Sequence, residues 1–338
     1  MRENMPMTLL TRRGLATGLA ACAVLPSPAL AQGGGAGVDN LRRTARSLKQ
    51  LHAILVQRGD GLLLAEAPRG PGLDRAANIK SCSKSIVALL LGTAIARKEI
   101  ASVTARLRDV APRLVPPDAT PGAGDITLED LVTLRAGLES TSGANYGSWV
   151  QSSNWVAYAL RRPMWDRPGG RMIYSTGSTH VLGAALAAAT GKSLLALARE
   201  RLGTPLGITV PEWRRDPQGF YFGGNEMALT PRALLRIALL VRDRGRYAGA
   251  QVIPESWIAA SVTPRTHSPF SGLAYGYGWF LSDSGWVIAR GYGGQIIAAH
   301  PAKRLALAIT SDPAQPARSE GYFGDLMGLL DGPVLALA

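Results

Sequence analysis

Ser81 and Lys84 stand three residues apart at the start of an apolar segment, Ser85 to Ala96. Residues with this spacing lie on one face of a helix, about one turn apart, so the lysine amine can reach the serine hydroxyl. A serine hydroxyl needs an adjacent base to become an effective nucleophile. A lysine can be that base only if its amine is neutral near pH 7, which burial or nearby positive potential can bring about. The spacing therefore predicts nucleophilic catalysis, with Ser81 as nucleophile and Lys84 as its base.

A purely structural interpretation of the pair is that Ser81 caps a helix and Lys84 is solvated. Two observations favour catalysis over this interpretation. Lys84 is the only lysine with a serine three residues before it, and the segment that follows is apolar on all sides. Such a segment is typical of a buried helix, so Lys84 should point to the interior or into a cleft. Cys82 is a less favoured nucleophile, because no histidine-based partner pattern accompanies it.

Two further segments carry groups that could act on the same substrate carbonyl. Tyr174 lies in a turn before a helix expected from about Thr179, where its hydroxyl could be a second proton carrier. A core or rim tyrosine is the simpler interpretation. Residues 290–295, Arg-Gly-Tyr-Gly-Gly-Gln, place glycines on an expected edge strand. Glycines there let a substrate approach and leave N–H groups for an oxyanion, although such clusters also form ordinary bulges and turns.

Hydrophobic periodicity predicts strands near both ends of the chain and helices between them. A first helix is expected over Val38 to Leu51, and a hairpin follows with strands at His52–Val56 and Leu62–Ala65. Later strands are expected at Tyr275–Leu281, Gly285–Ala289, Gln295–His300 and Leu305–Thr310, before a closing helix from about Glu320 to Leu330.

This order predicts an α+β fold with one antiparallel sheet, built from both termini and flanked by helices, and an inserted mainly helical domain. The sheet domain is expected over residues 38–84 and 205–338, and the helical domain over 85–204. The active site should lie in the cleft between the two.

The first 31 residues have the features of an export signal. The pair Arg12-Arg13 precedes an apolar stretch to Leu25, and Ala29-Leu30-Ala31 offers a small-x-small cleavage site. We therefore expect a twin-arginine signal peptide over 1–31, a flexible tether over 32–37, and a periplasmic or secreted protein. The alternative is a lipid anchor on Cys22, ranked second because the residues after it stay apolar.

Charge and composition exclude several functions. The net charge is +13, but the arginines are scattered and no nucleic-acid motif accompanies them, so no nucleic-acid partner is expected. No segment after the leader has the roughly 18 apolar residues needed to span a membrane, so stable insertion is not expected. The four histidines are isolated from each other and from cysteine pairs, so no metal site and no cofactor are predicted.

Several other stretches complete a wider pattern. They are Ile126–Leu138 (ITLEDLVTLRAGL), Gly223–Met227 (GGNEM) and Tyr275–Trp279 (YGYGW). In their order and spacing, and together with Ser-x-x-Lys, they resemble the serine hydrolases of the class C β-lactamase and penicillin-binding superfamily. Family VIII esterases and 6-aminohexanoate-dimer hydrolases are included in it. The resemblance extends from about residue 38 to 312 and implies a β-lactamase/transpeptidase-like fold.

The resemblance also implies roles for single residues. Ser81 matches the acylated nucleophile, Lys84 the lysine of Ser-x-x-Lys, and Tyr174 the tyrosine of Tyr-x-Asn, which shares proton transfer with the lysine. The backbone N–H groups of Ser81 and Gln295 would then form the oxyanion hole. Removing one such donor typically costs about 3 to 4 kcal/mol of transition-state stabilisation.

The chain departs from the family pattern at two substrate-binding motifs. Thr176 stands where many relatives have asparagine, and Tyr292, Gly293 and Gly294 align with the Lys-Thr-Gly of β-lactamases. The second change removes the cation that pairs with the carboxylate of a β-lactam. Arg290 could replace this cation, or it could be a surface charge.

The departures favour small-molecule esters and amides over β-lactams as substrates. The sequence therefore predicts a serine hydrolase that acts through an acyl-enzyme, carboxylesterase-like or amidase-like. The alternatives are a β-lactamase or penicillin-binding protein, DD-peptidase-like, with the same fold, and a non-catalytic relative that binds cell wall.

Overall fold

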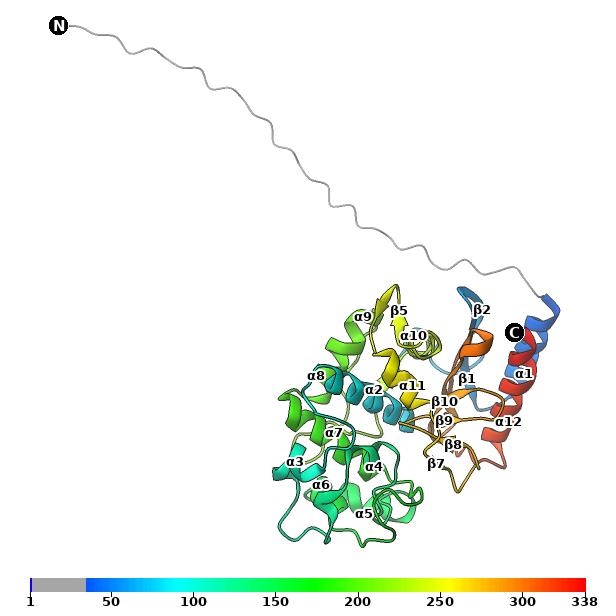
Figure 1. Cartoon of the computed structure of the whole chain (residues 1–338). Helices are drawn as coiled ribbons and strands as arrows, with labels where there is room; N and C mark the ends of the chain where they lie inside the picture. The colour runs from blue at the N-terminus through cyan, green and yellow to red at the C-terminus, as the bar shows by residue number, and fades with distance from the viewer. Residues whose placement is uncertain (2–34) are drawn as a thin grey trace.

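One large sheet with helices on both faces forms the centre of the molecule in the computed structural model, which describes Met1 and residues 35–338 (Figure 1). Its eight strands have the order β2-β1-β12-β11-β10-β9-β8-β7, and neighbouring strands are antiparallel. Strands from the two ends of the chain are neighbours, because β1 (Leu51–Arg58) pairs with β12 (Leu305–Ser311). The predicted α+β fold, with an antiparallel sheet built from both termini, is confirmed. Apart from Met1, the predicted leader lies outside the described residues, as do residues 32–34 of the predicted tether.

The centre of the sheet is made of apolar strands that are buried on both faces. Every residue of β11 (Gln295–His300) and of β12 is buried, which explains why these strands have near-continuous aliphatic sequences. The other strands of this sheet are β2 (Gly61–Glu66), β7 (Thr266–His267), β8 (Ala274–Tyr275), β9 (Phe280–Leu281) and β10 (Val287–Gly291).

Two strand predictions are corrected by the structure. The single strand expected over Tyr275–Leu281 is divided into β8 and β9 by a tight turn, in which Gly278 has a φ of +81°. A side chain at Gly278 would also collide with Ala88 of helix α2 (Ser83–Ala96), so the close approach of this helix requires glycine in the turn. The strand expected at Gly285–Ala289 begins later and ends at Gly291, which moves the glycine cluster into a hairpin turn.

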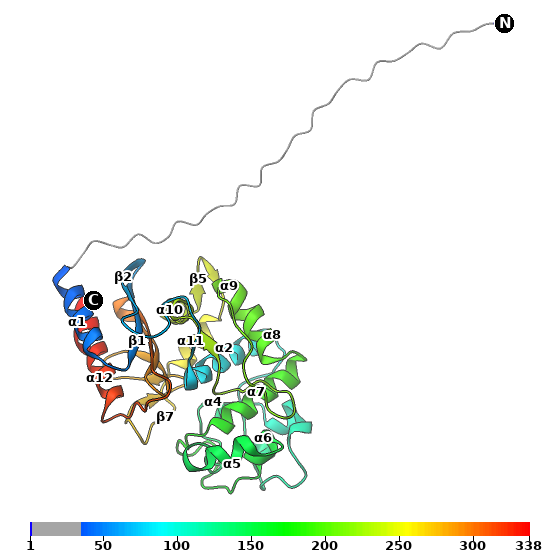
Figure 2. The same cartoon turned by 180° about the vertical axis from the view of Figure 1, so that it is seen from behind.

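Helices cover both faces of the sheet, and Figures 1 and 2 show the two layers from opposite sides. On one face, α1 (Gly35–Ser47) lies beside α12 (Tyr322–Leu329), and their apolar residues form a core cluster with the sheet. On the other face, α10 (Pro231–Arg242) packs on β11 and β12. Both terminal helices differ from their predicted bounds, since α1 begins before Val38 and ends before Leu51, and α12 continues as π and 3₁₀ turns to Leu337.

Helix α2 (Ser83–Ala96) lies at the centre of the larger core cluster, and its residues from Ser83 to Ala94 are all buried. This confirms the prediction of a buried helix after Ser81. Further α-helices are α3 (Leu107–Val110), α4 (Leu128–Val132), α5 (Tyr146–Gln151), α6 (Trp155–Leu160), α7 (Thr176–Thr190), α8 (Leu194–Ala198), α9 (Thr204–Leu206) and α11 (Glu255–Ser261).

Two small strand pairs lie outside the large sheet. The pair of β3 (Ala77–Asn78) and β4 (Ala228–Leu229) brings the segment before Ser81 beside the segment 223–227. The other pair is β5 (Arg246–Tyr247) with β6 (Ala250–Gln251).

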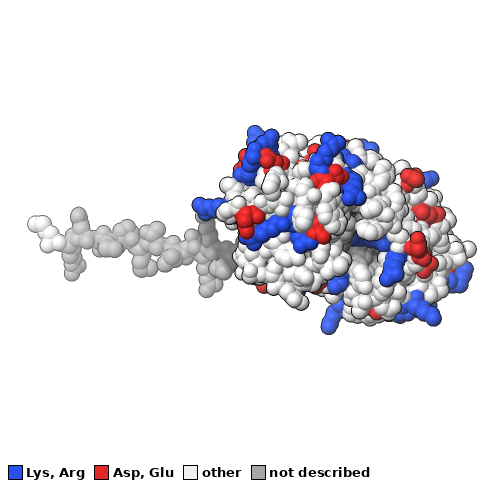
Figure 3. All heavy atoms as spheres, turned by 90° about the horizontal axis from the view of Figure 1, so that it is seen from below, with Lys and Arg blue, Asp and Glu red and all other residues white. Residues whose placement is uncertain are grey.

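No single described helix is long and apolar enough to cross a membrane. By length and composition, the only combination of described helices that meets the criterion is Thr176–Thr190 with Leu194–Leu206, a pair bent by 82°. Basic and acidic side chains are interspersed on the face drawn in Figure 3.

Candidate active site

Ser81 lies in a single 3₁₀ turn, Lys80–Cys82, directly before α2. Lys80 has a φ of +51°, an unfavourable value for a residue with a side chain. The Asn78 side chain holds this conformation by accepting the Lys80 N–H at 2.9 Å, and the Ser83 hydroxyl donates to the Lys80 carbonyl at 2.6 Å. Strained backbone of this kind is characteristic of functional sites.

The amine of Lys84 has three hydrogen-bond partners in a buried position. Nζ lies 3.2 Å from Ser81 Oγ, 3.2 Å from Thr176 Oγ1 and 2.8 Å from the Gly224 carbonyl oxygen. The side chain is almost completely buried, and this desolvation lowers the pKa of Lys84 to about 7. A substantial fraction of the amine is therefore neutral at physiological pH, as a base for Ser81 must be.

Tyr174 closes the other side of the nucleophile. Its side chain lines the same cavity as Ser81, and its ring centroid lies 5.0 Å from Lys84 Nζ. Burial raises the pKa of Tyr174 to about 12, although the nearby Ser81 side chain and the positive charge of Arg290 oppose the rise. The phenol thus keeps its proton at neutral pH and can donate it.

Thr176, the first residue of α7, connects the lysine to a second hydroxyl. Its Oγ1 lies 3.0 Å from the hydroxyl of Ser142, which also accepts the Thr176 N–H at 2.9 Å. Ser142 did not stand out in the sequence, because a single serine in a polar loop has no distinguishing pattern.

The segment that supplies the Gly224 carbonyl is fixed on both sides. Glu226 has a φ of +65° and forms an ion pair with Lys80 at 3.4 Å, so the two residues with left-handed backbone are bound to each other. A Cβ on Gly224 would lie 3.2 Å from Lys84 Nζ, which leaves little space for a side chain. The sequence contained this glycine only as part of the GGNEM stretch, with no role attached.

The backbone groups near Ser81 suit an oxyanion hole. Within residues 35–338, no acceptor is found for the N–H of Ser81 or of Tyr292. The Gly291 carbonyl faces the hairpin, where it accepts the Gly294 N–H at 3.1 Å. Neighbouring residues of a strand direct their backbone N–H and C=O groups to opposite edges. Since the Gly291 carbonyl faces β11, the Tyr292 N–H faces the β9 side of β10, beyond the end of β9.

The other residues of the predicted third motif lie elsewhere. Gln295 is fully buried, and its side chain both donates to and accepts from the backbone of Ser311. Gly293 packs against the backbone of Asp312, and Gly294 packs against Tyr322. Among the described residues, Tyr292 is found on the wall of the cavity beside Ser81, whereas Gly293, Gly294 and Gln295 are not.

Two cavities meet at Tyr174 and Phe270. The first, of about 230 Å³, is lined by Ser81, Tyr174, Ser268, Phe270, Phe280, Arg290, Gly291, Tyr292 and Ala317. The second, of about 490 Å³, shares Tyr174 and Phe270 with the first. The candidate nucleophile Ser81, its candidate base Lys84 and Tyr174 therefore lie together beside a space that could hold a small molecule.

Arg290 brings positive charge into the smaller cavity. Its guanidinium donates to the Ala317 carbonyl at 2.8 Å and to the Ser319 hydroxyl at 3.2 Å, and it stacks on Phe323. Among the described residues, no carboxylate forms an ion pair with it. Burial lowers the pKa of Arg290 to about 10, so the group remains charged at neutral pH.

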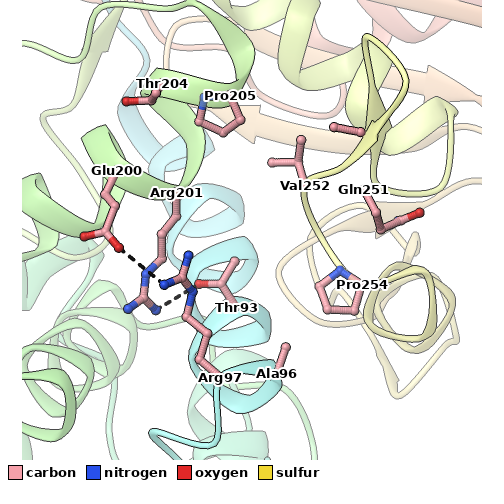
Figure 4. Close-up of a pocket in the computed structure, with 11 residues that line it drawn as sticks. Thr93, Ala96, Arg97, Glu200, Arg201, Thr204, Pro205, Gln251, Val252 and Pro254 are labelled. Carbon is pink, nitrogen blue, oxygen red and sulfur yellow. Dashed lines mark hydrogen bonds and ion pairs between the residues drawn. The ribbon is translucent and has the colours of Figure 1, made fainter.

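A third cavity, of about 620 Å³, lies away from Ser81 between α2, α9 and β6 (Figure 4). Its charged side chains are already paired, since Arg97 bonds to Glu200 at 3.4 Å and Arg201 bonds to Thr93 at 3.1 Å. It contains no nucleophile with an adjacent base. Across the part of the chain that is described, no three His, Cys, Asp or Glu side chains converge as a metal site would require.

Comparison with known families identifies the family of the chain. The Beta-lactamase family model matches residues 53–327, which include Ser81, Lys84, Tyr174 and Tyr292. The chain belongs to the Beta-lactamase family. The predicted resemblance is thereby confirmed, and with it membership of a hydrolase family. No curated protein sequence matches the chain.

Several solved structures have a similar fold. A protein from Bacillus anthracis provisionally assigned as a 6-aminohexanoate-dimer hydrolase has a TM-score of 0.73 at 17% identity, covering 88% of this chain and 82% of its own. EstCE1, a hydrolase with promiscuous acyltransferase activity, has a TM-score of 0.72 at 16% identity, covering 89% and 98%. An octameric penicillin-binding protein homologue from Pyrococcus abyssi has a TM-score of 0.66 at 17% identity, covering 88% and 77%. At these identities the likeness shows the β-lactamase/transpeptidase-like fold alone.

Proposed function

We propose that this Beta-lactamase family member is a serine hydrolase that cleaves small esters or amides through an acyl-enzyme. The observation that carries the proposal is the buried Lys84 amine, 3.2 Å from Ser81 Oγ and with a pKa lowered to about 7. A structural lysine would not need burial beside a serine, since burying an amine is costly. The proposal does not depend on any metal or cofactor.

The hydrogen bonds of Lys84 define how the reaction begins. A neutral amine has two N–H groups and one lone pair, and two of its partners, Thr176 and Gly224, can accept the N–H groups. The lone pair is then directed at the Ser81 hydroxyl. As Ser81 Oγ attacks the substrate carbonyl, its proton passes to Lys84.

Tyr174 completes acylation and then reverses its role. Its hydroxyl, on the wall of the Ser81 cavity, donates a proton to the leaving alcohol or amine as the tetrahedral intermediate collapses, and Lys84 restores the proton to Tyr174. In deacylation, a water molecule gives up a proton to the same pair and attacks the acyl carbonyl. The acid is released and the Ser81 hydroxyl is restored.

For the oxyanion hole we propose the N–H groups of Ser81 and Tyr292. The resemblance to the family implied the backbone N–H of Gln295 as the second donor, but Gln295 is fully buried, pairs with Gly291 across the β10–β11 hairpin and is not among the residues found to line the Ser81 cavity. Tyr292 is supported by its place on the cavity wall and by the absence of an acceptor for its N–H among the described residues. Both donors would stabilise the negative charge as it develops.

The decisive experiment is labelling of Ser81. Wild type, Ser81→Ala and the matched control Cys82→Ala are incubated with a fluorophosphonate, p-nitrophenyl butyrate and a penicillin, and examined by intact-protein mass spectrometry with released nitrophenol in parallel. We expect adducts and ester turnover in wild type and Cys82→Ala, and neither in a folded Ser81→Ala. A wild-type protein that no reagent acylates would instead support the non-catalytic relative.

A second candidate function, β-lactam hydrolysis or penicillin binding, is supported by Arg290. Its charge lies on the wall of the Ser81 cavity without a carboxylate partner in the described residues, so it could pair with the carboxylate of a β-lactam. This candidate predicts that Arg290→Gln slows acylation by penicillin far more than acylation by an uncharged ester. A stable penicillin adduct without ester turnover would favour the binding protein.

We also propose export to the periplasm or beyond, which is supported by the twin-arginine pair and the cleavage site of the leader. Amino-terminal sequencing of the exported protein tests this. Cleavage near Ala31 is expected, whereas cleavage before a lipidated Cys22 would support the anchor.

A further inference from the structure

The rim of the active site contains an unusual concentration of exposed aromatic rings. Apart from Met1, the exposed large hydrophobic side chains of the described residues are Trp165, Phe270 and Tyr292, with 54%, 71% and 53% of their surface accessible. All three line the two cavities that meet at Tyr174. Exposed apolar groups that gather at one site, rather than scatter over the surface, indicate a binding function.

The larger cavity has a predominantly apolar wall. Trp165 and Phe270 form its rim, and the buried side chains of Met172 and Ile173 contribute to its lining. The one charged side chain found on its wall, Arg171, lies 3.8 Å from Asp166. With a volume of about 490 Å³, the cavity is within the range of sites that bind small organic molecules.

We infer that this larger cavity binds an aromatic group of the substrate, with Trp165 and Phe270 as the residues that select it. The inference rests on the proposed hydrolase function, because the occupant must extend from a carbonyl at Ser81 past Tyr174. Flat rings suit the site, since edge-to-face and stacked contacts with Trp165 and Phe270 add to the burial of apolar surface. An acetyl ester of a small alcohol would leave this cavity unfilled.

The test compares substrates that differ only in the ring. The kcat/KM values of ethyl acetate, benzyl acetate and ethyl phenylacetate are measured for wild type, Trp165→Ala, Phe270→Ala and the control Tyr247→Ala, which lies on β5. We expect wild type to prefer at least one benzyl-type ester by roughly tenfold or more. The preference should fall in Trp165→Ala and Phe270→Ala, mainly through KM, and persist in Tyr247→Ala. Equal rates for all three esters, or a preference that survives both alanine variants, would overturn the inference.

A binding measurement separates this inference from the proposed reaction. Calorimetric titration of Ser81→Ala with phenylacetate and with acetate does not require turnover. Tighter binding of phenylacetate that is lost in Ser81→Ala/Trp165→Ala would support the aromatic subsite even if wild type hydrolysed nothing. Equal, weak binding of both acids would refute it even if wild type were an active esterase.

An independent observation concerns a buried histidine–aspartate pair that the reaction does not use. His180 of α7 is fully buried, and its Nε2 lies 3.0 Å from Asp216 Oδ2, which is equally inaccessible. The other carboxylate oxygen of Asp216 accepts the N–H groups of Gln218 and Phe220 at 2.9 and 2.8 Å. Asp216 is thus fully bonded as a carboxylate, and it orients the imidazole.

The second nitrogen of His180 reaches towards the active site. Nδ1 accepts the N–H of Gly223 at 3.3 Å, and the next carbonyl along the chain, that of Gly224, accepts from Lys84 at 2.8 Å. Gly223 lies so close to the Thr179 carbonyl that no side chain fits there. The rings of Trp149, Trp155 and Phe222 surround the imidazole with centroids 5.4 to 5.9 Å away.

We propose that His180 and Asp216 are positioning residues that hold the Gly224 carbonyl against Lys84. This proposal also rests on Lys84 being the base. A carbonyl acceptor stabilises the protonated amine, so its displacement should lower the pKa of Lys84 further and move the pH profile of kcat/KM to lower pH. Cys82 and Tyr174, the titratable groups that face Lys84 from the nucleophile's side, are unchanged by substitution at His180.

Two isosteric variants distinguish positioning from packing. His180→Asn keeps an acceptor near the position of Nδ1, whereas His180→Gln keeps a donor near the position of Nε2 but loses the acceptor. We expect His180→Gln to lower kcat/KM and to move its midpoint by about half a pH unit or more, with partial recovery in His180→Asn. Asp216→Asn, which keeps the ring in place, should move the midpoint in the same direction. Folded variants with the wild-type midpoint would refute the proposal, and labelling of Ser81 reports separately whether the hydrolase function holds.

Discussion

The pKa of Lys84 makes the activity depend on pH in a specific way. Since only the neutral amine can accept the Ser81 proton, kcat/KM should follow the fraction of enzyme with a neutral lysine. With a pKa of about 7, this fraction is about 10% at pH 6 and about 1% at pH 5. The profile should therefore rise tenfold per pH unit up to pH 7 and be level above it. The pKa of Tyr174, about 12, places its deprotonation beyond the usual range of measurement.

The magnitude can be worked from the burial of the lysine. An ordinary lysine, with a pKa of 10.5, would have about one neutral amine in 3,000 at pH 7. The environment of Lys84 removes the cost of deprotonating the amine at pH 7. That cost is equivalent to about 5 kcal/mol of activation free energy. This amount is comparable to the contribution of a general base to many enzymes.

The assay is the rate of ester hydrolysis between pH 5 and 10, with the product acid separated by chromatography so that pH does not affect detection. Lys80→Arg is the matched control, because it retains the ion pair with Glu226 and leaves Lys84 untouched. It should show the same midpoint as wild type. A rate that keeps rising with unit slope to pH 10 would mean that Lys84 is protonated as in water. A flat profile from pH 5 would mean that it is not the base.

Three further predictions concern the same groups. Lys84→Met removes an amine whose burial destabilises the folded wild type. This destabilisation is complete below pH 7 and decreases up to pH 10.5, because over that interval the folded protein has lost the Lys84 proton while the unfolded chain keeps it. Urea unfolding should show the stability advantage of Lys84→Met over wild type decreasing by up to about 4 kcal/mol between pH 7 and 10, and a constant difference would contradict the lowered pKa. Tyr174→Phe should lower kcat by about a hundredfold or more without a loss of folding, as measured by steady-state kinetics and thermal unfolding, whereas an unchanged kcat would exclude Tyr174 as a proton carrier. Thr176→Val removes an acceptor from Lys84 and should move the midpoint of kcat/KM to lower pH, so a midpoint that rises would argue against this bond.

The sequence predicted those features that depend on local spacing. Ser81 and Lys84 are one helical turn apart, and the apolar sequence of α2 required burial, so their contact followed from helix geometry. Strands β11 and β12 were found because each is a continuous aliphatic run. Their length and composition left few alternatives.

Features that depend on distant contacts were not accessible in this way. The Gly224 carbonyl is 140 positions from Lys84, and only the pairing of β3 with β4 brings it near. The glycines of the 290–295 segment were expected on a strand, but the hairpin between β10 and β11 places Gly293 and Gly294 in its turn. Turn position and register depend on packing against α12 and the end of β12, which no local pattern specifies. The predicted domain boundaries remain predictions.

Burial of α2 has a consequence for how the protein would lose activity on heating. Helix α2, which directly follows the turn with Ser81, is buried from Ser83 to Ala94, so the part of the helix beside Ser81 has no exposed turn that could fray ahead of the rest of the core. Displacement of Ser81 from Lys84 would require opening of the main apolar cluster itself. Residual activity after a heat pulse should therefore be proportional to the fraction of molecules that are still folded. Labelling of Ser81 with an active-site reagent would then report global unfolding directly.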